Sequence, residues 1–275
     1  MKDSEEHIID SAHRGLFNWK ELWRYRELFY FFTWRDVKIK YKQTALGFLW
    51  AILQPLLMMI IFTLFFGRVL HVPSQNIPYP VFVLSGLLLW NLFSTGLTNS
   101  ANSMVTNSTI IKKIYFPRLI IPTSSILVSL FDFLMAFVLF ILLLVYYQQS
   151  VEWNALLCWP LALFISVIAT LGPGCLLAAL NVKYRDFRYV IPFLIQILFF
   201  LTPIIYPVSM LKYPVLQYLL VMSPMYAAVE LFRLPLTNDE INFIFLSISL
   251  SSGLLFLFSG ILYFKKTEDF FADFA

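Results

Sequence analysis

Asp132 is the residue whose type and position most directly suggest chemistry. It is the one charged residue in the six longest apolar segments of this 275-residue chain. An ionisable group inside a membrane is costly and is a functional candidate by default. It could bind substrate, be protonated, or be hydrogen-bonded within the membrane, for example through Ser125 or Ser129. One carboxylate without a basic partner is a sparse proton relay, so the pattern disfavours an ion-driven carrier.

Phosphate-binding and catalytic patterns are missing from the sequence. No glycine precedes a lysine, so the loop G-x-x-x-x-G-K-[ST] that cradles nucleotide phosphates is absent. Any ATP drive must therefore come from a partner. Asp36, Asp186 and Asp269 each lie beside a basic residue or near a chain end, and we interpret them as charge-paired structural groups. No acid, base and nucleophile occur at catalytic spacing, so we expect no catalytic residue.

Metal ligation is not indicated either. His7, His13 and His71 are scattered, and we interpret them as surface residues because metal sites need convergent ligands. Cys158 and Cys175 fall in one predicted helix, roughly 25 Å apart at about 1.5 Å per residue, which excludes a disulfide between them. We expect neither a metal nor a cofactor in this chain.

The composition indicates that lipid is the solvent for much of the chain. Hydrophobic residues make up 60% and charged residues 13%, against about 25% charged in soluble domains. A helix of about 20 apolar residues can cross a bilayer. Six segments satisfy this condition: about 44–66, 81–102, 119–147, 156–181, 189–207 and 241–264. The first begins too late for a signal peptide.

The basic residues indicate the orientation of these six segments. Lys and Arg gather in residues 1–43, 103–118, 182–188 and 265–266. Only Arg68, Lys212 and Arg233 fall on the other side. The positive-inside rule then places both termini in the cytoplasm. Because the charge follows topology instead of forming one basic face, we expect no nucleic-acid partner.

Two further segments are not predicted to cross. Residues 18–32 place Trp19, Leu22, Trp23 and Phe29 on one helical face, which is typical of an amphipathic helix lying in the membrane interface. A solvated helix is the alternative. Residues 208–235 contain three prolines that separate apolar pieces of about ten residues, which are too short to cross. They favour a pair of re-entrant half-helices, with an outer loop and interfacial helix as the alternative.

Four cytoplasmic segments, read together, resemble the ABC-2 type permeases that export lipid-linked polysaccharides. They contain RDVKIKYKQTALGFLW at 35–50, KKIYFPRLIIP at 112–122, YRDFRYVIP at 184–192 leading into TPIIYP at 202–207, and FKKTEDFFAD at 264–273. The resemblance covers nearly the whole chain. It is nearest to the O-antigen exporters, and capsule and teichoic-acid permeases look similar.

This resemblance implies a single ABC-2 transmembrane domain over residues 1–275, all-α and polytopic, in the bacterial inner membrane. It implies a dimer of this chain with two ATPase subunits that hold ATP and Mg, and a lipid-linked polysaccharide as substrate. Export of a small molecule and a membrane glycosyltransferase-type enzyme remain alternatives. The glycosyltransferase would need an acidic catalytic site, which the sequence does not offer.

The resemblance also implies roles for individual residues. A coupling helix that docks on the ATPase matches Asn107, Ile110, Ile111, Lys112, Lys113, Phe116, Pro117 and Arg118. There the apolar side chains could fill a cleft, the basic ones could meet an acidic rim, and Pro117 would end the helix. The interfacial helix would hold a basic cluster where an anionic lipid enters, formed by Arg35, Lys38, Lys40 and Lys42. The cluster could equally be a topology anchor.

A glycan pathway needs aromatic faces on which sugar rings can stack and few fixed charges. The predicted first, second and fifth membrane spans supply seven candidates: Trp50, Phe62, Trp90, Phe93, Phe199, Phe200 and Tyr206. Aromatic residues that simply face lipid are the alternative for each of them.

Overall fold

The computed structural model describes residues 19–42, 47–184, 186–237, 241–268 and 271, and within them it contains helices and no strands. Five helical segments are long and apolar enough to cross a membrane. They are α3 (Leu49–Phe62) with its π-helical continuation η1 (Thr63–Val69), α4 (Tyr79–Thr106), α6 (Ile120–Tyr146), α7 (Cys158–Lys183) and α11 (Phe243–Thr267). The predicted all-α polytopic membrane fold is confirmed. His7, His13 and Asp269 lie outside the described residues.

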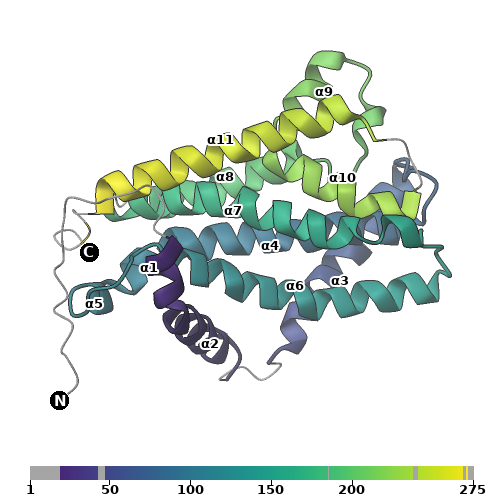
Figure 1. Ribbon diagram of the computed structural model, residues 1–275. Coiled ribbons are helices and arrows are strands. Elements are labelled where there is room, and N and C mark those ends of the chain that lie inside the picture. Colours follow the sequence, from purple (N-terminus) through teal and green to yellow (C-terminus); the bar gives the residue numbers. More distant parts are fainter. Residues whose placement is uncertain (1–18, 43–46, 185, 238–240, 269–270, 272–275) are drawn as a thin grey trace.

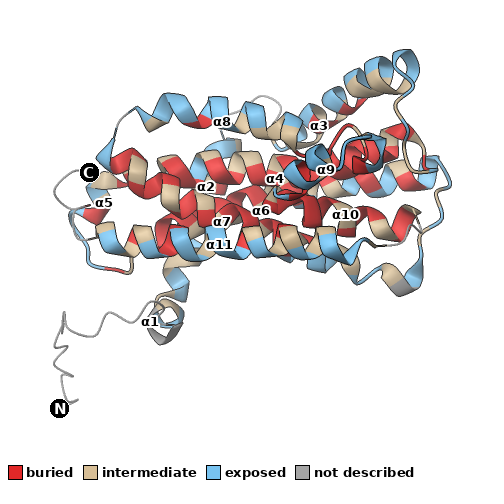
Figure 2. Ribbon diagram, turned by 90° about the horizontal axis from the view of Figure 1, so that it is seen from above, coloured by how far each residue is buried: buried red, intermediate tan, exposed pale blue. Residues whose placement is uncertain are grey.

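Helix α4 forms the centre of the bundle. It packs between α6 and α7, and 78% of its most apolar stretch is buried. Small residues allow this, because a Cβ atom at Gly96 would lie 2.9 Å from the Thr170 methyl group. Figure 1 shows the long helices side by side, and Figure 2 shows the buried residues along the middle of the bundle, with α8 and α11 more exposed at its edges.

Helices α7 and α11 approach each other closely at two glycines. A Cβ atom on Gly260 would lie 2.0 Å from the Gly172 carbonyl oxygen, and one on Gly172 would lie 2.5 Å from the backbone of Phe256. No other residue type fits at this crossing. Apolar helices in lipid associate through such close packing because they gain little from hydrophobic burial.

The predicted fifth span, 189–207, is not one continuous helix. Helix α8 (Phe187–Leu201) has 15 residues, or about 22 Å, and it ends where Thr202 adopts an extended conformation before Pro203. A residue that precedes proline disfavours the α conformation. Residues 203–207 therefore continue as an irregular segment, in which Ile204 and Ile205 are buried.

Two helices occupy the predicted re-entrant region, after the short turn η3 (Val208–Met210). Helices α9 (Pro214–Val221) and α10 (Pro224–Thr237) meet at an angle of 93°. This is the geometry of a broken membrane span or a re-entrant loop. The bend falls just before Pro224, which cannot continue the hydrogen bonds of the preceding helix. On the same side of the bundle, η2 (Trp153–Ala155) leads into α7.

The N-terminal amphipathic segment forms two helices, α1 (Trp19–Arg24) and α2 (Arg26–Lys42). Helix α2 extends well beyond the predicted end at residue 32 and packs against α6. Figure 1 shows that it lies against the side of the bundle, near the end that carries α5 (Ser108–Ile111). The predicted shared face was wrong in one respect. Leu22 and Phe29 pack toward Phe32 and the protein, whereas Trp23 is 71% exposed.

Candidate functional site

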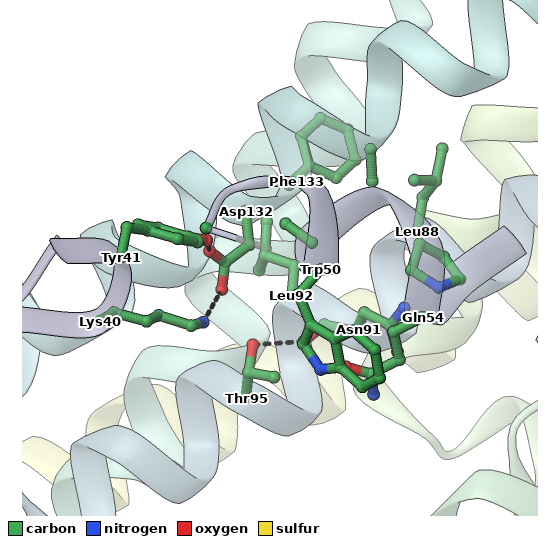
Figure 3. Close-up of a pocket in the computed structure, with 14 residues that line it drawn as sticks. Lys40, Tyr41, Trp50, Gln54, Leu88, Asn91, Leu92, Thr95, Asp132 and Phe133 are labelled. Atoms are coloured by element: carbon green, nitrogen blue, oxygen red, sulfur yellow. Dashed lines mark hydrogen bonds and ion pairs between the residues drawn. The ribbon is translucent and has the colours of Figure 1, made fainter. Parts of the chain in front are cut away.

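Asp132 of α6 is paired with the C-terminal end of α2. Lys40 donates a hydrogen bond and forms an ion pair with one carboxylate oxygen, and the Tyr41 hydroxyl donates to the other (Figure 3). The expectation that Asp132 lacks a basic partner was wrong, and so was the suggested bond to Ser125 or Ser129. Sequence separation hid the pairing, because the partners lie more than 90 residues apart.

The pairing explains how two charges are tolerated at this position. Asp132 lies about 18 Å along α6 from Ile120, at about 1.5 Å per residue, and its side chain is 17% exposed. A carboxylate removed from water needs a cation and further hydrogen bonds to offset lost hydration. Burial, together with the hydrogen bond and negative charge of Asp132, raises the pKa of Tyr41 above its usual range. The phenol therefore remains a proton donor to Asp132.

The Lys40–Asp132 pair forms one end of a cavity of about 400 Å³ between α2, α3, α4 and α6. Such a volume is within the usual range for small-molecule sites, about 300–1,000 Å³. Apolar side chains make up much of the wall, among them Leu88, Leu92 and Phe133. The cavity thus joins a charged end to an apolar wall.

Polar side chains of α3 and α4 also line this cavity. Trp50 and Gln54 are spaced by one helical turn on α3, as are Asn91 and Thr95 on α4, so each pair shares a face. The Thr95 hydroxyl donates to the Asn91 carbonyl oxygen at 2.5 Å (Figure 3). Sequence reasoning singled out only Trp50 of these four. The signal available was polar residues spaced four apart within apolar segments.

The other members of the predicted basic cluster differ in their surroundings. Arg35 pairs with Asp36 at 2.7 Å and donates to the Asn107 side-chain oxygen, also at 2.7 Å. It therefore fastens α2 to the end of α4, and the expected charge pairing of Asp36 is confirmed. Lys38 is exposed and lies over the Trp34 ring, and Lys42 is exposed.

Five of the seven proposed pathway aromatics form one connected cluster. Phe199 of α8 stacks on Phe62 at 5.7 Å and meets Trp90 edge-on at 5.5 Å, while Phe93 and Phe200 extend the cluster. Tyr206 donates to the Phe200 carbonyl oxygen at 2.7 Å. Trp50 is separate and lines the cavity beside Lys40.

Burial divides this aromatic cluster into two layers. Trp90 and Phe93 are buried inside the single chain, with 5% and 3% exposed. These two rings form the buried side of the cluster, so they do not offer a face to a passing glycan. Phe200 is exposed, and Phe62 and Phe199 are half-buried. The aromatic faces open to a ligand therefore belong to α3 and α8.

Segment 107–118 packs two of its apolar side chains into the protein. Ile111 and Phe116 are buried, and Phe116 packs on Phe32 at 5.7 Å. These two side chains therefore anchor the loop in the protein's own core, and the cleft-filling role predicted for them does not fit their position. Asn107 is also buried, and its side chain donates to the Ser103 carbonyl oxygen at 2.9 Å.

The remaining predicted coupling residues differ in whether they contact their own chain or are exposed. Pro117 does not end the coupling helix, because α5 ends at Ile111. Arg118 contacts the Glu268 carbonyl oxygen after α11, so it is bound to its own chain. Lys112 and Lys113 are exposed, and Ile110 is half-buried.

The tip of this loop carries two apolar side chains that sequence reasoning missed. Ile114 is 62% exposed and Tyr115 is 64% exposed. They follow the two exposed lysines directly, so the tip of the loop presents Lys112 to Tyr115 as a mixed basic and apolar surface. The alternation of buried and exposed positions depends on the turn after α5, which has no helical period to reveal it.

Arg233, which the sequence places among the basic residues of the outer side, is buried in the structure. It is 1% exposed and donates to the carbonyl oxygens of Pro203, Ile204 and Phe82 at 2.7–3.1 Å, and to Ser85 Oγ at 3.2 Å. Segment 203–207 has no helical ladder to satisfy its carbonyls, and a guanidinium supplies several donors from one side chain. Arg233 thus fixes the irregular end of the predicted fifth span against α4.

The fold and these loops define a permease of one particular family. Residues 27–237 match the ABC-2 type transporter family, and the chain belongs to it. The match begins in α2 and ends with α10, so it includes the Asp132 site, the 107–118 loop and Arg233.

Curated relatives of the chain are transport proteins of this kind. An O-antigen export system permease protein, RfbA, from Klebsiella pneumoniae is 30% identical over 241 residues, covering 88% of this chain and 92% of the relative. RfbA from Myxococcus xanthus is 34% identical, covering 70% and 73%. The polysialic acid transport protein KpsM from Escherichia coli is 26% identical, covering 72% and 77%.

Proposed function

We propose that this chain is the membrane-spanning subunit of an ATP-driven exporter that moves a lipid-linked, O-antigen-like polysaccharide out of the cytoplasm across the inner membrane. The alignment with the Klebsiella pneumoniae O-antigen permease carries the proposal, because it covers nearly the full length of both chains. The absence of a phosphate-binding loop from the sequence supports an ATPase on a separate subunit.

In this proposal two copies of the chain work with two ATPase subunits, which bind ATP and Mg. The loop tip from Lys112 to Tyr115 is the docking surface, since its two lysines and two apolar side chains are exposed. Both chain ends lie on that side of the membrane, in the cytoplasm. The Arg118–Glu268 contact ties the loop to the end of α11, so movement of the loop would reach a long membrane helix directly.

The glycan would pass along the exposed aromatic faces of α3 and α8. Phe62, Phe199 and Phe200 offer such faces, and an aromatic ring can stack on the C–H face of a sugar without holding a charged group. The sliding polymer is then bound weakly at many positions, which a translocation path requires.

Deletion of the gene tests this function. Surface glycan and lipid-linked glycan inside the cell are measured in the deletion strain, and in the same strain carrying the gene on a plasmid. Loss at the surface with accumulation inside, reversed by the plasmid, is the expected result. Unchanged surface glycan would contradict polysaccharide export and would favour export of a small molecule instead.

Capsular polysaccharide is the second candidate substrate. It is favoured by the match to the polysialic acid transport protein, which covers 72% of this chain. The same deletion strain separates the two candidates, because O-antigen and capsule are extracted and detected separately. Loss of capsule with normal O-antigen would select this alternative.

A further inference from the structure

The cavity beside Asp132 contains donors that the protein itself does not use. Within the described part of the chain, the side-chain amides of Gln54 and Asn91 have no hydrogen-bond partner, although both line the cavity. Lys40 reaches the same cavity, and its one ion-pair partner there is Asp132. Polar groups that converge on a concave, mostly apolar surface are typical of a ligand site.

We propose that this cavity binds the phosphate group of an anionic amphiphile, and that the phosphate takes the place of Asp132 as the partner of Lys40. The amide groups of Gln54 and Asn91 donate to the remaining phosphate oxygens. The lipid chain lies along the apolar part of the lining, where Trp50 is 53% exposed. The proposal rests on the proposed function, because a lipid-linked glycan carries phosphate between its lipid and its sugar.

The chemistry of the lining selects this class of ligand. Lys40 is the cation of the cavity, and its side chain is 40% exposed, so an incoming anion can reach it. Phosphate accepts hydrogen bonds strongly, and the free groups of Gln54 and Asn91 include amide N–H donors. The apolar wall disfavours a bare inorganic ion. The cavity also lies beside α2, which contributes Lys40 and Tyr41 to its lining.

Tyr41 holds the Asp132 carboxylate in position when the phosphate replaces it as the partner of Lys40. Its hydroxyl donates to the Asp132 oxygen that Lys40 does not contact. When Lys40 turns to the phosphate, Asp132 gives up its cation but keeps this hydrogen bond, which offsets part of the cost of leaving the carboxylate without a counter-ion. Asp132 therefore acts as a resident counter-ion that occupies Lys40 while the cavity is empty.

Binding to the purified full-length protein in a nonionic detergent tests the proposal. The probes are farnesyl phosphate, dioleoyl phosphatidylglycerol and, as the uncharged control, farnesol. Lys40→Gln should weaken farnesyl phosphate binding about tenfold, the usual value of one charge-assisted hydrogen bond. Asp132→Asn should strengthen it, because Lys40 is no longer held. Lys212→Gln, an exposed lysine on another part of the chain, should leave it unchanged.

The opposite effects of the two variants separate a binding site from a structural latch. If the pair only fastens α2 to α6, both variants lower the thermal unfolding midpoint and neither strengthens binding, and the proposal is overturned. Asn91→Leu provides an independent test, since it leaves the ion pair intact. It should weaken binding several-fold, and unchanged binding would contradict the assignment of that amide.

The probes also identify the source of the phosphate. Stronger binding of farnesyl phosphate than of phosphatidylglycerol assigns the site to a prenyl-linked substrate, and the reverse assigns it to a bilayer phospholipid. Binding of farnesol as tight as that of its phosphate would overturn the proposal. These measurements need no transport, so they stand apart from the deletion experiment. Export can be verified while the site fails, and the site can be verified while export fails.

Discussion

Individual charged residues show how this chain satisfies polar groups away from water. Arg233 counts in the sequence as a basic residue of an outer loop, yet it is buried against α4 and donates to three backbone carbonyls. Gly86 makes the space, because a Cβ atom there would lie 2.8 Å from the guanidinium. The residue thus compensates for the helix broken at Pro203.

Arg233→Met should lower stability strongly. The substitution leaves the carbonyls of Pro203 and Ile204 buried without a donor, at a cost of about 1–3 kcal/mol for each unsatisfied group. The measurement is the thermal unfolding midpoint of the detergent-solubilised protein. Arg68→Met is the matched control, since Arg68 is exposed, and its midpoint should stay near that of the unmodified chain. Equal midpoints for the two variants would contradict the role given to Arg233.

The packing of α7 against α11 depends on which glycines lie at the crossing of the two helices. Gly260 faces Gly172 across the α7–α11 crossing with no space for a Cβ atom, whereas a Cβ atom on Gly253 of the same helix would meet only Pro224, at 3.5 Å. The two glycines look alike in the sequence. Only the crossing point distinguishes them.

Gly260→Ala should therefore destabilise the protein, and Gly253→Ala should not. Overpacking of a tight contact typically costs about 1–3 kcal/mol, while replacement of a helical glycine by alanine in open space is neutral or favourable. Thermal unfolding of both variants in the same detergent is the measurement. A Gly253→Ala protein as unstable as Gly260→Ala would show that the crossing is not the determinant.

The loop after α5 is the element whose exposed tip carries the coupling prediction. Ile114→Ser combined with Tyr115→Ser should reduce glycan export and ATPase stimulation more than tenfold, because truncation of two central apolar contacts at about 1 kcal/mol or more each removes about 2 kcal/mol of docking energy. Membrane insertion should be unchanged. Tyr146→Ser is the control, since that side chain is 78% exposed at the opposite end of α6. Normal export by the double variant would remove the docking role.

The whole molecule exposes far more apolar surface than a soluble protein. Only 11% of the α3 stretch and 22% of the α11 stretch are buried in the single chain. Lipid, or a second copy in the proposed dimer, must cover these faces. Helices α4, α6, α7 and α11 run side by side along the length of the bundle (Figure 1).

Reporter fusions test the predicted orientation of the whole chain. Green fluorescent protein attached after Ala275 should fluoresce, because the positive-inside rule places that end in the cytoplasm. Alkaline phosphatase attached after Gln149, between α6 and α7, should be active, because it would then lie outside. An active phosphatase at the C-terminus with an inactive one after Gln149 would reverse the topology.

The class of protein and most of its helices could be predicted from the amino-acid sequence alone. Long apolar segments with one charge among them require lipid on physical grounds alone, and motifs such as KKIYFPR at 112–118 resemble one transporter family. Predicted spans agree with α3, α4, α6, α7 and α11 to within a few residues at most ends. Helix periodicity and apolar length are local properties, so a local reading recovers them.

Which polar groups meet could not be predicted in this way, because it depends on how the helices pack. Lys40 and Asp132 lie 92 positions apart, and nothing in the spacing of either residue indicates the other. Ile111 and Phe116 were predicted to face a partner, yet they fill the core beneath the loop. Periodicity tells which residues share a face of a helix. It does not tell which neighbour covers that face, because that depends on how helices cross and where prolines such as Pro203 interrupt them.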